Sequence, residues 1–143
     1  MKIKILLKSI CLLVISIAIY STSKGQSNTK SGINQADTTI TTQELEGLIK
    51  TRAKVKILDV RKKIDFEADP QLIPTATWQD PTAIEEWAKG LPKESPIVVY
   101  CVHGHKVSRD VTSRLLELGY HAQLLEGGIH SWKELGGNTL PAK

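Results

Sequence analysis

Cysteine is scarce in this sequence, and its scarcity excludes one class of redox chemistry. Of the 143 residues only two are Cys: Cys11, in an apolar N-terminal run, and Cys101. No Cys-x-x-Cys pair occurs, so a thioredoxin-type dithiol cycle is excluded. A Gly-x-Ser-x-Gly motif is also absent, which disfavours a Ser-His-Asp hydrolase.

Acidic residues are missing from the first 25 positions, and this absence explains the basic balance of the chain. The formal charge is +4, and Lys2, Lys4, Lys8 and Lys24 all lie in that stretch. Without them, 15 of the 19 basic residues stand against 15 acidic residues, so the rest of the chain is neutral. A basic excess confined to one terminus gives no reason to expect a nucleic-acid partner.

The apolar N-terminal run has the layout of a secretory signal peptide. It extends from Ile10 to Tyr20, interrupted only by Ser16, after a lysine-containing start and before small residues. Such a run is too short for a comfortable membrane span. We therefore predict a signal peptide over residues 1–25 and a periplasmic or secreted protein with no membrane partner after cleavage. An uncleaved N-terminal membrane anchor is the alternative.

Loss of the signal peptide would leave Cys101 as the only thiol. Residues 26–37 are polar and aperiodic, which predicts a flexible linker before a single domain over residues 38–141. A lone thiol in an exported protein cannot form an internal disulfide. It is buried and inert, paired with another molecule, or reactive.

Short β-rich runs alternate with helical patterns in the predicted domain. Strands are expected at 55–60, 96–100 and 122–125, with a shorter one between 73 and 78. Helices are expected at 41–49, 81–90, 106–118 and 129–135, with a short irregular or helical piece at 65–69. This alternation predicts an α/β domain with a mostly parallel central sheet flanked by helices.

Cys101 follows directly on a predicted strand and stands a few residues before a predicted helix. Ligands of open parallel sheets bind beyond the carboxyl ends of the strands, which is where this position falls. Backbone N–H groups between Cys101 and Lys106 are not used by a helix ladder and can converge on one point. With the helix dipole they would favour a thiolate on Cys101 or an anion beside it. Gly104 permits the tight bend.

Polar side chains within this turn could assist such chemistry. Lys106 adds a positive charge, and His103 and His105 could donate hydrogen bonds or move protons. Two alternatives stay open: a buried, inert Cys101, and a zinc or copper site formed by Cys101, His103 and His105. Because the turn at Gly104 breaks the common face of these side chains, we predict no metal and no cofactor.

Asp59 and Arg61 lie at the end of the first apolar strand. If that strand is a neighbour of the strand ending at Tyr100, both side chains reach the same edge of the sheet as Cys101. Arg61 could then hold the loop or an anionic substrate, and Asp59 could accept hydrogen bonds from loop N–H groups. A surface ion pair is the alternative.

Several separated stretches, in order along the chain, resemble the rhodanese family. They are Ile57-Leu-Asp-Val-Arg61, Ile73-Pro-Thr-Ala76, Val98-Val-Tyr-Cys101, Leu118-Gly-Tyr120 and Leu125-Glu-Gly-Gly-Ile-His-Ser-Trp132. Two stretches, Trp78-Gln-Asp-Pro81 and Cys101-Val-His-Gly-His105, further resemble a rhodanese subgroup associated with chromate-resistance proteins. The resemblance covers residues 38–141 and implies a rhodanese-like fold with a five-stranded central sheet.

What the resemblance implies is a sulfurtransferase that works through a persulfide on Cys101. Sulfane sulfur would pass from a small sulfur-containing anion such as thiosulfate to a thiol or cyanide acceptor, or to a partner thiol protein. Asp59 and Ser108 are then expected as structural support. The expected substrate-binding residues are Val102, His103, Gly104, His105, Lys106, Val107 and Arg61.

The active-site segment departs from the family pattern Cys-x-x-Gly-x-Arg-Ser. Lys106 stands at the Arg position, and the Ser comes one place late, at Ser108. In this superfamily a longer loop ending in Arg is associated with phosphatases and arsenate reductases, but Val107 occupies the corresponding place. Loss of the guanidinium fork disfavours that oxyanion chemistry. A persulfide-carrying or sulfide-sensing module without enzymatic turnover, and a silent binding domain, remain as alternatives.

Overall fold

The central sheet has five strands, and all of its neighbouring strands are parallel. The computed structural model describes residues 38–143, and its strand order is β1 (Thr39–Ile40), β6 (Ala122–Leu125), β5 (Ile97–Tyr100), β2 (Lys56–Asp59) and β4 (Thr77–Trp78). This arrangement confirms the predicted α/β architecture. The predicted signal peptide and linker, residues 1–37, lie outside the described residues. Within residues 38–143, no helix is long and apolar enough to cross a membrane.

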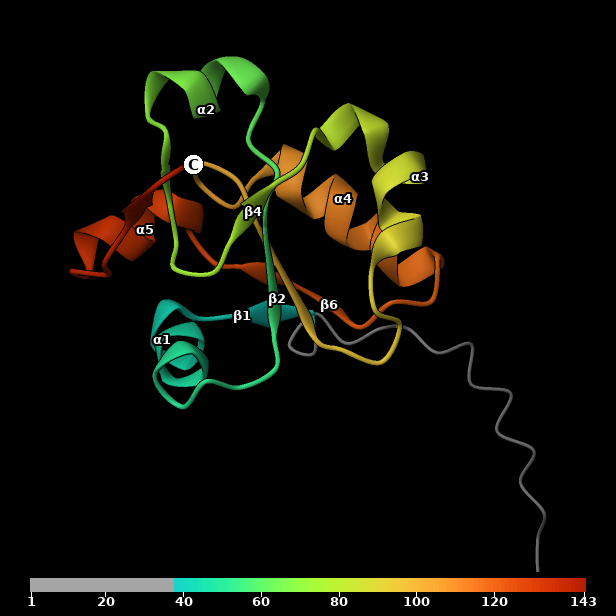
Figure 1. The fold of residues 1–143 in the computed structure, drawn as a ribbon, viewed down its shortest axis with the longest axis horizontal. Helices are drawn as coiled ribbons and strands as arrows, with labels where there is room; N and C mark the ends of the chain where they lie inside the picture. Colours follow the sequence, from blue (N-terminus) through green and yellow to red (C-terminus); the bar gives the residue numbers. More distant parts are fainter. Residues whose placement is uncertain (1–37) are drawn as a thin grey trace, which may run out of the picture. The chain divides into compact units, whose positions relative to one another are not determined.

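Helices cover both faces of the sheet (Figure 1), and strands β2 and β5 accordingly bury consecutive residues, which point to opposite faces. Val98 and Tyr100 pack in one core cluster with residues of α1 (Thr42–Lys50) and α5 (Gly128–Glu134). Ile97 and Val99 pack on the opposite face with residues of α4 (Lys106–Glu117) and of the segment around α3 (Ile84–Trp87). Strand β5 is completely buried between the two helix layers.

Helix α1 begins where the sequence predicts it, and a capping box fixes its first turn. The Thr41 hydroxyl accepts from the Glu44 backbone N–H, and the Glu44 carboxylate accepts from the Thr41 backbone N–H at 2.8 Å. These reciprocal bonds satisfy donors that the helix ladder leaves free. The predicted helix at 81–90 is instead divided into a 3-10 turn η2 (Pro81–Ala83), α3, and a second 3-10 turn η3 (Ala88–Gly90).

A small second sheet was not expected from the sequence. Strand β3 (Gln71–Leu72) pairs antiparallel with β7 (Leu140–Pro141), near the end of the chain. Each strand has two residues and β7 contains a proline, so neither produces a detectable alternation of apolar residues. The irregular piece predicted at 65–69 is the helix α2 (Lys63–Ala68), which begins two residues earlier.

Candidate active site

Cys101 lies immediately beyond the carboxyl end of β5, the middle strand of the sheet. Its neighbours on either side are β2 and β6, so the position is enclosed by the two adjacent strand ends. The residue retains 6% of its possible exposure. A thiol at this place is nearly excluded from solvent, but it stands at the edge where parallel α/β sheets bind ligands.

The turn between Cys101 and α4 offers unused hydrogen-bond donors. Within residues 38–143, the backbone N–H groups of Val102, His103, Gly104 and His105 donate no hydrogen bond to protein atoms. The first N–H groups of α4 are likewise free of intrahelical acceptors, as in any helix. A run of such donors beside a sulfur atom is suited to hold a thiolate, a persulfide anion or a small anionic substrate.

A second contact to the thiol comes from Ser108, in the first turn of α4. The Ser108 hydroxyl lies 3.0 Å from the Cys101 sulfur and can donate to it. Ser108 is fully buried, so this hydroxyl is screened from water. The sequence suggested only a supporting role for Ser108; the structure brings its side chain into direct contact with Cys101.

The turn is held in place by the beginning of α5. The Ile129 N–H donates to the Cys101 carbonyl at 3.0 Å, and the His130 N–H donates to the Val102 carbonyl at 2.9 Å. These bonds bring the turn and the helix so close that a Cβ atom on Gly128 would lie 2.4 Å from the Cys101 carbonyl oxygen. Gly104, at φ +68°, is equally confined, since a Cβ there would lie 2.8 Å from the Leu125 carbonyl oxygen. Both positions therefore require glycine.

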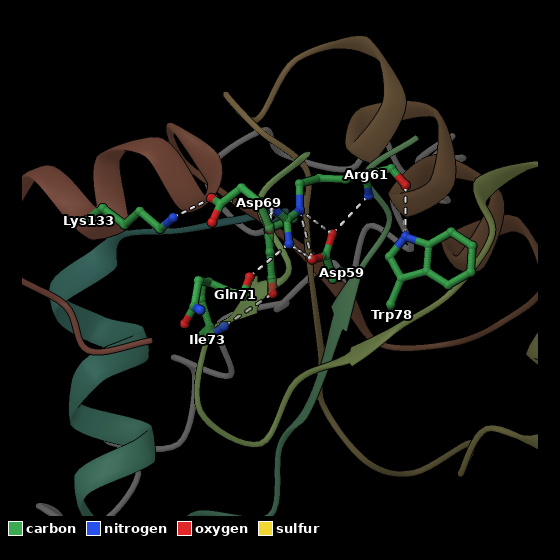
Figure 2. A network of polar contacts seen from close by, with 8 residues as sticks. Asp59, Arg61, Asp69, Gln71, Ile73, Trp78 and Lys133 are labelled. Carbon is green, nitrogen blue, oxygen red and sulfur yellow. Dashed lines mark hydrogen bonds and ion pairs between the residues drawn. The ribbon is translucent and has the colours of Figure 1, made fainter. Parts of the chain in front are cut away.

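Asp59 and Arg61 reach the same sheet edge as Cys101, as expected, because Asp59 on β2 is in register with Tyr100 on β5. Their side chains form a buried ion pair, with Arg61 Nη2 2.6 Å from Asp59 Oδ2 (Figure 2). The Arg61 guanidinium also donates to the backbone carbonyls of Asp69 and Gln71. The alternative of a surface ion pair is wrong, since both side chains are buried.

The expectation that Arg61 binds substrate is not supported by its surroundings. Its guanidinium is bonded to Asp59 and to two carbonyls, and the side chain is only 2% exposed. Asp59 accepts from the Arg61 side chain and backbone N–H rather than from loop N–H groups. This pair instead braces the ends of β2 and β3 next to the site. Burial, with a further contribution from the Asp59 carboxylate, also raises the pKa of Tyr100.

The remaining polar side chains of the turn point to solvent. Lys106 is 86% exposed and forms an ion pair with Asp110 one helical turn away, at 2.6 Å. The His103 ring lies 5.9 Å from that of His105 and 4.8 Å from that of His130, measured between centroids. In the described part of the chain, no group of three or more His, Cys, Asp or Glu side chains is arranged to hold a metal ion. Val107 is half-buried in the first turn of α4.

The Rhodanese-like domain model matches residues 41–135, which include four of the five strands of the sheet, the Cys101 turn and α5. The chain belongs to the rhodanese-like domain family. Among curated relatives, the thiosulfate sulfurtransferase GlpE of Coxiella burnetii is 33% identical over 87 residues, covering 60% of this chain and 78% of that protein.

Solved structures agree with this assignment. A rhodanese-related protein from Thermoplasma volcanium superposes with a TM-score of 0.63 and 27% identity, covering 72% of this chain and 97% of the other. A rhodanese-like domain protein from Staphylococcus aureus gives a TM-score of 0.62 and 28% identity, covering 71% and 96%. The finer resemblance to the chromate-resistance subgroup stays a prediction.

Two contributors to this rhodanese-like site were missed by reasoning from the sequence. Gly128 and His130 belong to the stretch Leu125–Trp132, which contributes to the family resemblance but carries no predicted site residue. The glycine pair at 127–128 was the available signal, because adjacent glycines often mark a close approach of two backbones. No local sequence pattern predicts that the His130 ring lies against the His103 ring, since the two residues belong to different elements.

Proposed function

We propose that this protein is a sulfurtransferase that carries sulfane sulfur on Cys101. The observation behind the proposal is the position of the sulfur atom, which contacts the Ser108 hydroxyl and is followed by a turn whose N–H groups have no acceptor within residues 38–143. Membership of the rhodanese-like family and similarity to a thiosulfate sulfurtransferase support this choice of chemistry.

The proposed cycle has two displacement steps at sulfur. The Cys101 thiolate attacks the outer sulfur of thiosulfate, a sulfur–sulfur bond forms, and sulfite leaves with the electron pair of the broken bond. An acceptor such as cyanide then attacks the outer sulfur of the persulfide and leaves as thiocyanate, which restores the thiolate. Neither step needs an external oxidant or reductant. The turn N–H groups and Ser108 stabilise the negative sulfur in both states.

Intact-mass measurement after incubation with thiosulfate tests the proposal. The protein should gain about 32 Da, the mass of one sulfur atom, and the gain should be absent in Cys101→Ser and disappear when cyanide is added. An adduct that forms but is not transferred to any small acceptor would favour a persulfide carrier instead. Absence of an adduct with thiosulfate and with polysulfide would overturn both.

We further propose that the protein is exported, with residues 1–25 as a cleaved signal peptide. The support is the lysine-containing start, the short apolar run and the small residues that follow it. N-terminal sequencing of protein recovered from a periplasmic extract or the culture medium should begin after Ser23 or Gly25. Recovery of the intact N-terminus in the membrane fraction would instead identify an anchor.

A further inference from the structure

A hollow of about 450 Å³ lies beside the Cys101 turn. One wall is the turn itself, at His103, Gly104 and His105, and the opposite wall is the start of α5. Cys101 is not among the residues that line it. A molecule in this hollow would therefore contact the turn that follows Cys101, and not the thiol directly.

The hollow is rich in hydrogen-bond donors. Arg109, His103, His105 and His130 all line it, against one carboxylate, that of Glu126. Arg61 and Arg114 have ion-pair partners, but the Arg109 guanidinium has none within residues 38–143. An exposed guanidinium next to imidazole N–H donors is a suitable partner for a carboxylate, which it can hold through two parallel hydrogen bonds.

The hollow is larger than a site for the smallest substrates needs to be. Pockets that bind small organic molecules have volumes of about 300–1,000 Å³, and this one falls within that range. Thiosulfate and cyanide have only a few atoms and would leave most of it unfilled. A second hollow of about 460 Å³ adjoins it along α4, and both include Thr39, Arg109 and Leu124 in their linings. The space therefore suits a ligand with a carbon skeleton.

We propose that this hollow binds the carboxylate end of a small anionic thiol, the molecule that takes sulfur from Cys101. The inference rests on the proposed function, because it names the acceptor class of the same site. Arg109 holds the carboxylate, and the turn between Cys101 and Lys106 separates the carboxylate from the reacting sulfur atoms. The acceptor thiolate attacks the outer sulfur of the Cys101 persulfide, the sulfur–sulfur bond within the protein breaks, and Cys101 leaves as a thiolate while the acceptor becomes a persulfide.

Competing acceptors test the assignment. The persulfidated full chain is mixed with mercaptosuccinate, which carries two carboxylates, or with neutral 2-mercaptoethanol, and the rate of sulfur loss is measured at low salt. The quantity compared is the rate constant with mercaptosuccinate divided by the rate constant with 2-mercaptoethanol. In Arg109→Gln this ratio should fall about fivefold to tenfold relative to the unsubstituted protein. Because the same two thiols are used with both proteins, their different intrinsic reactivities cancel when the ratios are compared.

A matched control is available in Arg52, which is also exposed and has no side-chain partner within residues 38–143. Arg52 precedes β2, whereas Cys101 follows β5 in the same parallel sheet, so the two lie toward opposite edges. Arg52→Gln removes the same charge and should leave the ratio unchanged. An equal ratio in Arg109→Gln and in the unsubstituted protein, or an equal fall in Arg52→Gln, would overturn the inference.

Binding of succinate provides a readout that does not depend on sulfur transfer. Succinate has the two carboxylates but no thiol, so its binding can be followed by amide NMR even in a protein that forms no persulfide. Titration should shift the signals of residues 103–105 and 130, and Arg109→Gln should abolish these shifts. No shift at these positions overturns the hollow as a carboxylate site, whereas shifts without any Cys101 adduct would retain the site and reject the proposed transfer.

Discussion

The hydroxyl of Ser108 lies 3.0 Å from the sulfur of Cys101, at a place where neither residue is open to water. The first turn of α4 brings the two together, since Ser108 is the third residue of that helix and Cys101 precedes it by a short turn. The sequence places this serine one position later than the family pattern. The contact shows that, although Ser108 comes one position later than in the family pattern, its hydroxyl still lies within hydrogen-bond distance of the sulfur.

Replacing Ser108 by Ala should slow persulfide formation without unfolding the protein. A hydrogen bond to an ionised group contributes about 1.5–3 kcal/mol, so the second-order rate constant with thiosulfate should fall by roughly tenfold to a hundredfold. Stopped-flow measurement of the first step, followed by intact mass, gives this number directly. Ser113→Ala is the matched control, because Ser113 lies on the same helix and is exposed. Equal rates in both variants would assign Ser108 a packing role only.

Gly128→Ala should impair the site far more than a comparable glycine replacement elsewhere. Gly128 has a φ of +59°, and a Cβ atom would meet the carbonyl oxygens of Cys101 and Val102 at 2.4 and 2.6 Å. The carbonyls belong to the turn itself, so they must move if the side chain is to fit. A displacement of about 1 Å at a reacting centre can cost about a hundredfold in rate, which is the loss we expect for sulfur transfer.

Gly136→Ala separates backbone strain from displacement of the turn. Gly136 has a φ of +81°, but a Cβ atom there would have no neighbour within 4 Å. Gly136→Ala should therefore lose about 1–2 kcal/mol of stability from the left-handed conformation, measured by urea unfolding. Gly128→Ala should lose more, because its Cβ atom also displaces the turn carbonyls. Only Gly128→Ala should lose activity in the folded fraction. A similar activity loss in both proteins would contradict the role assigned to the contact with Cys101.

The sequence was sufficient to predict those parts of the fold that depend on local patterns. Strands β2, β5 and β6 and the helix α4 follow from apolar runs and from spacing, and Cys101 was placed at a strand end for the same reason. Contacts between distant segments left no such pattern. The burial of Arg61 depends on carbonyl groups at Asp69 and Gln71, and the seating of the Cys101 turn depends on N–H groups at Ile129 and His130. Backbone groups of this kind are the same in every residue, so their positions have to come from the structure.

Arg61→Leu should destabilise the domain but leave the activity of the folded protein unchanged. Removing the guanidinium leaves the Asp59 carboxylate buried without its cation, which typically costs about 3–5 kcal/mol. Chemical denaturation should show this loss, and the double variant Asp59→Asn, Arg61→Leu should lose less than the sum of the single variants. The KM for thiosulfate, measured well below the unfolding transition, should not change. A raised KM in Arg61→Leu with unchanged stability would restore Arg61 as a substrate ligand.

The capping box of α1 should make stability depend on pH in the acidic range. Hydrogen bonds from the Thr41 backbone N–H and hydroxyl lower the pKa of Glu44 below its ordinary value of 4.5. Because the folded-state pKa is the lower one, the stabilisation is complete above the unfolded-state value and is lost as the pH falls through the folded-state value. Thermal unfolding of Glu44→Gln should therefore occur at a lower temperature than that of the unsubstituted protein at pH 7. The difference should shrink as the pH is lowered below 4.5, and a constant difference from pH 7 to pH 3 would show that the charge on Glu44 contributes nothing to the cap.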